Sequence, residues 1–303
     1  MTKNILLTGG SGFIGTKLTA LLIANGYSVS ILTRSDRKVS MGVTYYKWNL
    51  ENNYIDEDAV LKADYIIHLA GEGIAAKKWT DKRKKEILDS REKPIELIFS
   101  VLKNNNKTLD AFISASAVGI YGAYTSETIC TEETPAANDF LGQTCQKWEA
   151  ATNCIASLGI RTVKIRTGLV LGKNEGFLKK LVPIFKYGFG SIVGTGKQYM
   201  PWIHIDDLCA IYLQAIINLD MKGSYNAAVS DDTTNAIFSR AMANVYGYSI
   251  WLPKIPTFVV RLITGEMGEI ILTGQRVSSN KIESAGFKFK YSNLKPALLV
   301  CLK

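Results

Sequence analysis

The feature that most constrains the fold is a glycine-rich turn near the start of the chain. The apolar run Ile5–Leu7 has the composition of a buried strand, and an amphipathic segment begins at Phe13. Between them stand Gly9, Gly12 and Gly15. This order lets the chain bend sharply, lets a diphosphate lie against bare backbone and brings helix close to strand. The stretch therefore predicts a dinucleotide-binding turn rather than a glycine-rich surface loop.

Apolar strand-like runs alternate with helical segments along the first half of the chain, which favours a doubly wound parallel α/β sheet. The rhythm changes at Gly172. We expect a nucleotide-binding domain of residues 1–171 and 198–232, and a smaller mixed domain of residues 172–197 and 233–303. Further strands are expected at 28–33, 43–48, 63–71, 111–114, 161–166 and 223–228, with helices at 140–157 and 177–187 and two more beyond residue 235.

The net charge of +9 raises the question of a nucleic acid partner. Much of the excess is local, because residues 77–93 hold eight Lys/Arg against four Asp/Glu. The same stretch has helical spacing, which indicates a solvated helix face. No zinc, helix-turn-helix or aromatic RNA-binding signature accompanies the charge. We therefore expect no nucleic acid partner, and note that a basic surface also suits a small phosphate-bearing molecule.

Localisation and assembly follow from simpler features. No apolar stretch reaches the roughly 18 residues that a membrane span needs, and the N-terminal apolar run is expected to be a strand and not a signal peptide. The five cysteines form no CxxC pair, which is typical of reduced thiols. We expect a cytoplasmic protein without membrane contact, either a monomer or a homodimer.

The residues after the second expected strand indicate which dinucleotide binds. In NAD-preferring folds an acidic residue about 20 positions beyond the glycines binds the ribose 2′-hydroxyl. Arg34 occupies this place, with Ser35 and Arg37 beside it. A guanidinium suits a 2′-phosphate, which a carboxylate would repel. NADP is therefore expected in preference to NAD; the alternative is that Arg34 is a surface arginine at a strand end.

Later strand ends carry the candidates for chemistry. Ser114 and Ser116 stand near the carboxyl end of a parallel strand, where open α/β sheets bind ligands. The small residues Ala70 and Gly71 would let a cofactor pass over another strand end. His68 lies inside that strand, where a histidine is more often a hydrogen-bonded core residue than a catalyst.

Several motifs, taken together, resemble a known family. They are Thr8–Gly15, Leu69–Glu72, Ser90–Arg91, Ser114–Gly122, Trp148–Glu149, Trp202–Asp207, Gly265–Met267, Gly274–Arg276 and Ala285–Phe289. This set is similar to the extended short-chain dehydrogenase/reductases, and more narrowly to their atypical epimerase-like or cell-division-inhibitor-like branch. The resemblance spans nearly the whole chain.

The resemblance implies a Rossmann domain, an NADP-type cofactor and a mixed C-terminal substrate domain. It places cofactor contacts on the glycine turn, the ends of the second and fourth strands, the basic helix and the segment after the sixth strand. The implied contacts are Gly9, Ser11, Gly12, Phe13, Ile14, Gly15, Thr33, Arg34, Ser35, Leu69, Ala70, Gly71, Glu86, Arg91, Ser114, Arg166, Gly168 and Val170.

The chain departs from this family's pattern at the proton-transfer residues. In the family a serine or threonine acts with a tyrosine and with a lysine four residues later, whose ammonium lowers the tyrosine pKa and bonds the nicotinamide ribose. Ser116 is present, but Leu141 stands where the tyrosine belongs and Cys145 where the lysine belongs. Arg91 replaces a usual asparagine. The resemblance therefore supports cofactor binding more strongly than turnover.

Other groups are candidates to replace the missing pair. Tyr121 could reach a substrate or be a packed aromatic, and Cys145 could be a thiolate beside Arg91 or a small buried residue. Arg166 could bind a substrate anion or be a structural charge on the cofactor side. Tyr199 is more readily explained as a surface loop aromatic than as a catalytic residue. His204 is more readily explained by a hydrogen bond at the start of a helix than by catalysis.

Two functions follow. The first is an NADP(H)-dependent oxidoreductase or epimerase of a small polar substrate, a sugar nucleotide among the options, with Ser116, Tyr121 and Cys145 as candidate catalytic residues. The second is a non-catalytic NADP-binding sensor or scaffold, motivated by the loss of the tyrosine and the lysine.

Overall fold

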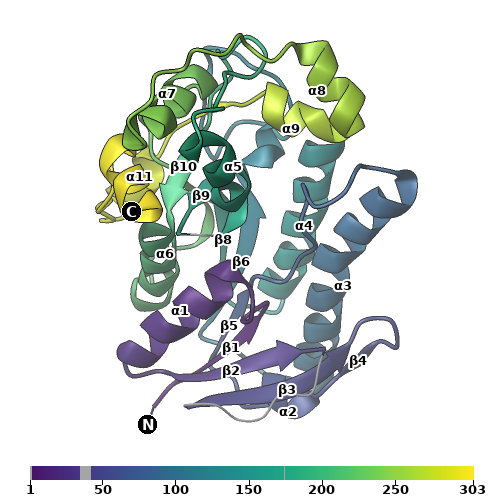
Figure 1. Ribbon diagram of the computed structural model, residues 1–303. Helices are drawn as coiled ribbons and strands as arrows, with labels where there is room; N and C mark the ends of the chain where they lie inside the picture. The colour runs from purple at the N-terminus through teal and green to yellow at the C-terminus, as the bar shows by residue number, and fades with distance from the viewer. Residues whose placement is uncertain (1, 35–41, 174) are drawn as a thin grey trace.

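A single large sheet organises the protein, whose computed structural model describes residues 2–34, 42–173 and 175–303. Within these residues eight strands pair in the order β11-β8-β6-β5-β1-β2-β3-β4 (Figure 1). All pairs are parallel except β3 with β4. The strands are β1 (Asn4–Thr8), β2 (Ser28–Thr33), β3 (Val43–Asn49), β4 (Tyr54–Ile55), β5 (Tyr65–His68), β6 (Ala111–Ala117), β8 (Thr162–Thr167) and β11 (Gly223–Ala227). The expected α/β sheet is confirmed.

The strand order reverses beside β1. From β1 the chain runs to β2 and β3 on one side, then crosses to β5 on the other side of β1. Thr8 and His68, the last residues of β1 and β5, lie next to each other in register. Open α/β sheets bind ligands at the carboxyl ends of strands at such a switch point, so a site is expected at this edge.

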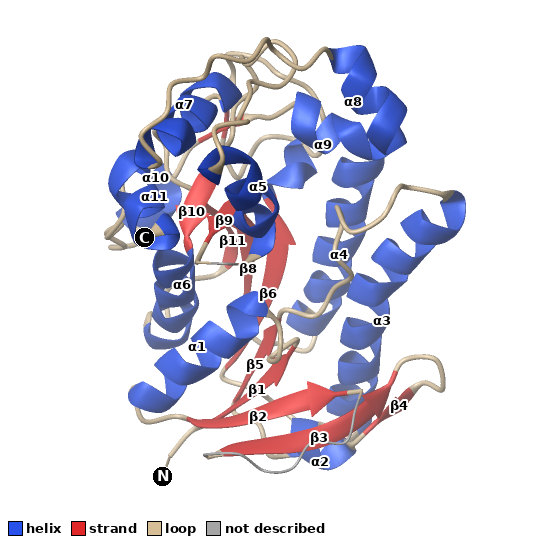
Figure 2. Cartoon of the chain, viewed as in Figure 1, coloured by secondary structure: helices blue, strands red, loops and turns tan. Residues whose placement is uncertain are grey.

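Helices cover both faces of the sheet, which makes the fold doubly wound (Figures 1 and 2). Ile5 and Leu7 of β1 belong to the core under α1 (Phe13–Ala24) and α6 (Ile205–Ile217). Leu6 belongs to the opposite core, under α2 (Glu57–Leu61), α3 (Asp81–Asn104) and α4 (Phe140–Ala156). Because successive side chains point to opposite faces, a strand buried on both sides has the continuous apolar run seen in the sequence.

The remaining elements gather beyond the carboxyl ends of the central strands (Figure 1), and some of them enclose another core. Leu171, Phe185, Trp202, Phe238 and Leu298 lie in it. Two short parallel pairs occur here, β9 (Leu169–Leu171) with β10 (Trp202–His204) and β7 (Ile129–Cys130) with β12 (Arg276–Val277). The helices are α5 (Gly176–Lys186), α7 (Asn235–Val245), α8 (Thr257–Thr264), α9 (Glu269–Leu272), α10 (Asn280–Ser284) and α11 (Leu294–Leu302), with 3-10 turns at Val118–Tyr121 (η1) and Gly265–Gly268 (η2).

The C-terminal part differs from the sequence expectation. Two helices were expected beyond residue 235, and the chain described there has five α-helices. The prediction was wrong because three of these helices are short. α9 and α10 have four and five residues and α8 has eight, which is too short for a helical period to show clearly. The predicted domain boundaries stay a prediction.

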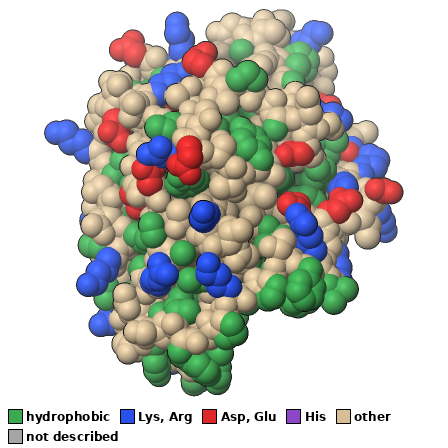
Figure 3. Space-filling view, turned by 90° about the horizontal axis from the view of Figure 1, so that it is seen from above, with side chains coloured by type: hydrophobic (Ala, Val, Ile, Leu, Met, Phe, Trp, Pro, Cys, Tyr) green, Lys and Arg blue, Asp and Glu red, His purple; other side chains and the backbone are tan. Residues whose placement is uncertain are grey.

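Surface charge bears on the expectation about a nucleic acid partner, and helix length on the expectation about a membrane span. On the face seen from above, the described Lys and Arg side chains lie scattered among acidic and apolar ones and do not form one continuous basic surface (Figure 3). Across the described ranges, the helices lack the combination of length and apolar character that a membrane crossing requires.

Candidate functional site

The glycine turn joins β1 to α1 in the geometry that a bound diphosphate needs. Gly9 has a φ of +69°, and a Cβ there would lie 2.9 Å from the Ala70 nitrogen. A Cβ at Gly15 would lie 2.3 Å from the Gly9 oxygen, so both positions need glycine for close packing. Gly12 precedes α1 and offers it no side-chain cap. A Cβ placed on Gly12 would meet only the Gly9 oxygen, at 3.3 Å. The first backbone N–H groups of α1 are therefore available to an anion.

Hydrogen bonds tie the end of β5 to this turn. The backbone nitrogens of Leu69 and Ala70 donate to Thr8 Oγ1 at 3.2 and 3.1 Å. The Thr8 hydroxyl in turn pairs with His68 Nδ1 at 2.7 Å. Burial lowers the pKa of His68 to about 3, so the ring is neutral. The interpretation of His68 as a hydrogen-bonded core residue is confirmed.

An open groove of about 580 Å³ lies beside the ends of β2 and β3. Arg34 lines it from β2, and Arg83 and Glu86 line it from α3. Arg83 donates to Glu86 at 3.0 Å and to Glu72 at 3.2 Å, which occupies both carboxylates. The predicted contacts Arg34 and Glu86 thus share one groove, while the predicted contact Ser35 lies outside the described residues. The described residues that line it are Arg34, Trp48, Asn49, Leu50, Glu51, Glu72, Lys77, Arg83, Glu86, Asp89, Ser90 and Lys93.

Arg91 lies deeper on α3 and is 9% exposed. Its Nη1 donates to the Ile87 oxygen at 2.8 Å and its Nη2 to the Glu72 oxygen at 3.1 Å. A Cβ at Gly71 would lie 3.4 Å from the Arg91 Cζ. Two predicted contacts, Gly71 and Arg91, therefore meet at the carboxyl end of β5.

Ser116 belongs to a buried hydrogen-bond network rather than to an open surface. The residue is 3% exposed, and its hydroxyl donates to Glu149 Oε1 at 2.8 Å. Arg166 donates to both oxygens of Glu149, from Nε at 2.8 Å and from Nη2 at 3.0 Å. Ser224 completes the set at 3.2 Å from Glu149 Oε2. The Arg166 guanidinium is thereby committed to an internal ion pair, which agrees with its interpretation as a structural charge.

Tyr121 closes the same network from η1. It is 1% exposed, donates to Asn226 Oδ1 at 2.6 Å and accepts from Arg166 Nη1 at 3.1 Å. Burial raises the pKa of Tyr121 to about 12. The side chain is a packed aromatic in this arrangement, and its catalytic role stays a prediction.

Cys145 lies on α4 and is 5% exposed. Burial raises the pKa of its thiol to about 12, although Arg91 acts in the opposite direction. A Cβ at Gly119 would lie 3.9 Å from the Cys145 Sγ and 3.6 Å from the Leu141 Cβ. The thiol is neutral near pH 7, so this residue supplies no charge where the resembled family has a lysine.

The other predicted contacts fall into two groups. Ser11 and Gly12 are exposed at the turn, and Phe13, Ile14, Thr33, Leu69 and Ala70 are partly exposed. Ser114 is buried and bonds the Ala115 oxygen at 2.9 Å. Gly168 is explained by packing, because a Cβ there would lie 2.5 Å from the Pro201 oxygen. Val170 is in β9, paired with Ile203 of β10. Their roles as cofactor contacts stay predictions.

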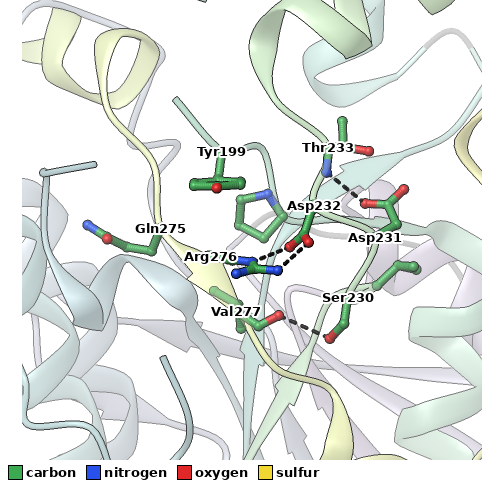
Figure 4. A pocket seen from close by; sticks show the side chains of 10 residues that line it. Tyr199, Ser230, Asp231, Asp232, Thr233, Gln275, Arg276 and Val277 are labelled. Carbon is green, nitrogen blue, oxygen red and sulfur yellow. Dashed lines mark hydrogen bonds and ion pairs between the residues drawn. The ribbon is translucent and has the colours of Figure 1, made fainter. Parts of the chain in front are cut away.

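Tyr199 and His204 have structural roles. His204 caps α6 by accepting from the Asp206 nitrogen at 3.2 Å, which confirms the helix-start interpretation. Tyr199 donates to Glu127 at 2.7 Å and lines a small hollow closed by the Arg276–Asp232 ion pair (Figure 4). The hollow has about 10 Å³, room for about one water. It does not hold a substrate.

Sequence reasoning missed Asn226 and the role of Glu149. Asn226 bonds a tyrosine 105 positions away, and Glu149 bonds a serine 33 positions away. Such separations leave no spacing signal. Within the described ranges, groups of His, Cys, Asp or Glu that could hold a metal are absent.

Known proteins are similar to this chain along nearly its whole length. The NAD dependent epimerase/dehydratase family model matches residues 5–228, and a domain of unknown function, DUF1731, matches residues 255–299. Epimerase family protein YfhF of Bacillus subtilis is 34% identical over 296 residues, 97% of this chain and 96% of its own.

Two solved structures are similar over the whole chain. Human epimerase family protein SDR39U1, solved with NADPH, has a TM-score of 0.86 at 28% identity and covers 99% of each chain. The nucleoside-diphosphate sugar epimerase from Corynebacterium glutamicum has a TM-score of 0.81 at 30% identity, covering 100% of this chain and 58% of its own. The resemblance inferred from the motifs is confirmed: this chain belongs to the NAD dependent epimerase/dehydratase family.

Proposed function

We propose that this chain binds NADP(H) and acts as an oxidoreductase or epimerase on a small polar substrate. The observation that carries the proposal is the uncapped start of α1 at Gly12, which follows β1, together with a groove that contains Arg34 at the end of the neighbouring strand β2. Human SDR39U1, whose structure was solved with NADPH, supports the same cofactor. When bound, NADP(H) would supply or accept a hydride at the nicotinamide ring.

The chain's own residues divide the binding task. Backbone N–H groups at the start of α1 hold the diphosphate, and Arg34 holds the adenosine 2′-phosphate. Leu69 and Ala70 are held in place by their hydrogen bonds to Thr8 and form the floor of the cofactor site at the end of β5. A sugar nucleotide is the substrate class we favour, on the name of the Corynebacterium relative.

A second function is favoured by the burial of the three candidate catalytic side chains. Ser116, Tyr121 and Cys145 are between 1% and 5% exposed. The serine hydroxyl is already committed to Glu149, and burial raises the pKa of both the tyrosine and the cysteine to about 12. None of them exchanges a proton readily near pH 7. This supports a non-catalytic NADP(H)-binding sensor or scaffold as the alternative.

Calorimetric titration with NADPH and NADH tests the cofactor. We expect tighter binding of NADPH, and an Arg34→Ala variant that loses about tenfold or more of that affinity, the usual effect of a charge-assisted bond. Arg240→Ala, an exposed arginine on α7, is the matched control. Equal affinity for the two nucleotides, or an unchanged preference in Arg34→Ala, contradicts the proposal.

Turnover separates the two functions. Purified protein with NADPH is screened against carbonyl compounds and nucleotide sugars. Turnover that falls in Ser116→Ala at unchanged NADPH affinity supports the enzyme. Binding of NADPH without turnover over the whole panel supports the sensor.

A further inference from the structure

Arg91 is a buried cation without a carboxylate partner. Its guanidinium donates to the backbone oxygens of Ile87 and Glu72 at 2.8 and 3.1 Å and to the Ser90 hydroxyl at 3.4 Å, all of them uncharged acceptors. In the described part of the chain, acidic side chains do not come within ion-pair distance of it. The Glu72 carboxylate acts on it only from farther away and is bonded to Arg83. The charge is therefore not neutralised within the described protein.

Two other arginines of the described residues, Arg83 and Arg166, are 6% and 7% exposed, and carboxylates neutralise both. Arg83 is bonded to Glu72 and Glu86, and Arg166 is bonded to both oxygens of Glu149. Removing a charge from water without a counter-charge is costly. Arg161 also bonds only backbone oxygens, but it is partly exposed, so water screens its charge. Arg91 lacks that screening, so a bound polar ligand would offset the cost, and the position of the guanidinium decides which ligand can reach it.

The guanidinium lies at the carboxyl edge of the sheet, between β5 and α4. Gly71 at the end of β5 leaves room for its Cζ, since a Cβ there would lie only 3.4 Å away. From α4, the Trp148 ring stacks under it with the Cζ 5.0 Å from the ring centroid. Cys145, one turn earlier on α4, is close enough for the Arg91 charge to act on its thiol. This is the edge at which the glycine turn offers its N–H groups.

We propose that Arg91 supplies from α3 the positive charge that the resembled family supplies from α4 with a lysine at position 145, and that it binds the nicotinamide ribose of NADP(H). The inference rests on the proposed NADP(H) binding and adds a division of labour to it. Arg34 holds the adenosine end and Arg91 holds the nicotinamide end.

The position of this charge on α3 also explains why position 145 holds a cysteine. A lysine at position 145 would place an ammonium beside the Arg91 guanidinium, and two like charges in a buried place repel strongly. A small neutral side chain avoids this. Cys145 is thus the residue that an arginine at position 91 requires, rather than a nucleophile.

Binding of two different ligands distinguishes the contacts made to the two ends of the cofactor. The adenosine fragment 2′,5′-ADP lacks the nicotinamide half, and NADPH contains both halves. We expect Arg91→Met to weaken NADPH binding about tenfold to a hundredfold, the range for hydrogen bonds to a charged group. The affinity for 2′,5′-ADP should change less than about threefold, because methionine keeps the stem that packs on Trp148. Arg34→Ala should weaken both ligands.

Arg161→Met is the matched control. Arg161 is also a partly buried guanidinium that bonds backbone oxygens, those of Ala215 and Met221. It precedes β8, at the amino end of the strands and away from the glycine turn. This variant is expected to alter the melting temperature and leave both nucleotide affinities unchanged.

The outcomes are distinguishable. If the wild type binds neither ligand, the proposed function fails. If it binds both and Arg91→Met changes neither affinity, or lowers both equally, the role of Arg91 is refuted. The double variant Arg91→Asn with Cys145→Lys moves the charge back to α4. A folded double variant that binds NADPH no better than Arg91→Asn alone also overturns the proposal, and recovery of affinity supports it.

Discussion

Replacing Glu149 with glutamine keeps the size of the side chain and removes its charge. Glu149 is 7% exposed and accepts from Ser116, Arg166 and Ser224. The amide would leave Arg166 buried without a counter-charge, and it has one acceptor oxygen where the carboxylate has two. Breaking a buried pair in this way costs about 3–5 kcal/mol.

The expected change in melting temperature follows from the chain length. For 303 residues, unfolding entropies of about 2.1 cal/mol/K per residue predict a fall of ~5–8 °C for a loss of that size. Thermal unfolding followed by circular dichroism measures it. Asp58→Asn is the control, because its pair with Lys62 is exposed at 61% and 58% of the two side chains and should cost less than about 1 kcal/mol.

The double variant Glu149→Gln with Arg166→Met sharpens the test. Removing both charges should cost less than removing the carboxylate alone, because no ion remains buried. Burial alone would raise the pKa of Glu149, but its bonds to Arg166 and Ser116 hold the pKa below its ordinary value. The stabilisation is therefore present above about pH 4.5 and lost as the pH falls through the lower folded pKa. A Glu149→Gln variant as stable as the wild type at pH 7 would refute this reasoning.

Two further predictions concern the glycine turn and His68. Gly15→Ala should lower stability by about 3 kcal/mol or more and abolish NADPH binding, because its Cβ would lie 2.3 Å from a backbone oxygen. Gly12→Ala should fold and lose mainly NADPH affinity. Thermal melts with and without NADPH measure both effects, and equal stability of the two variants would contradict the packing argument. The pKa of His68 is about 3 in the folded protein and near 6.5 in the unfolded chain, so the unfolded chain is protonated first and stability falls as the pH drops from 6.5 towards 3. The variant His68→Asn keeps an acceptor for Thr8 and should flatten that part of the pH profile of urea unfolding. A profile identical to that of the wild type would count against a buried neutral ring.

The sequence predicted the sheet and the turn because their signals are local. The apolar run of β1, the glycines and the start of α1 occupy one short stretch, and each position limits its neighbours. Arg34 could be placed by its distance from that turn. Its groove also contains Trp48 and Arg83, which come from elements that only the sheet order brings together.

The buried network could not be predicted for the opposite reason. Ser116 occupies a strand end where ligands bind, and nothing nearby in the sequence shows that its hydroxyl points to α4 instead. Gly168 illustrates the same difficulty, since its need for glycine arises from Pro201, far along the chain. Side-chain direction and distant packing decide such positions, and neither leaves a periodic trace.

The core beyond the carboxyl ends of the central strands has a consequence for synthesis. β9 and β10 bury Leu171 and Trp202 against Leu298 of α11. A ribosome-bound chain that has already emerged through β10 must therefore keep this apolar surface uncovered until α11 also leaves the exit tunnel. Chaperones that hold nascent chains would bind there, while the strands of the large sheet that precede β10 are already free to pair.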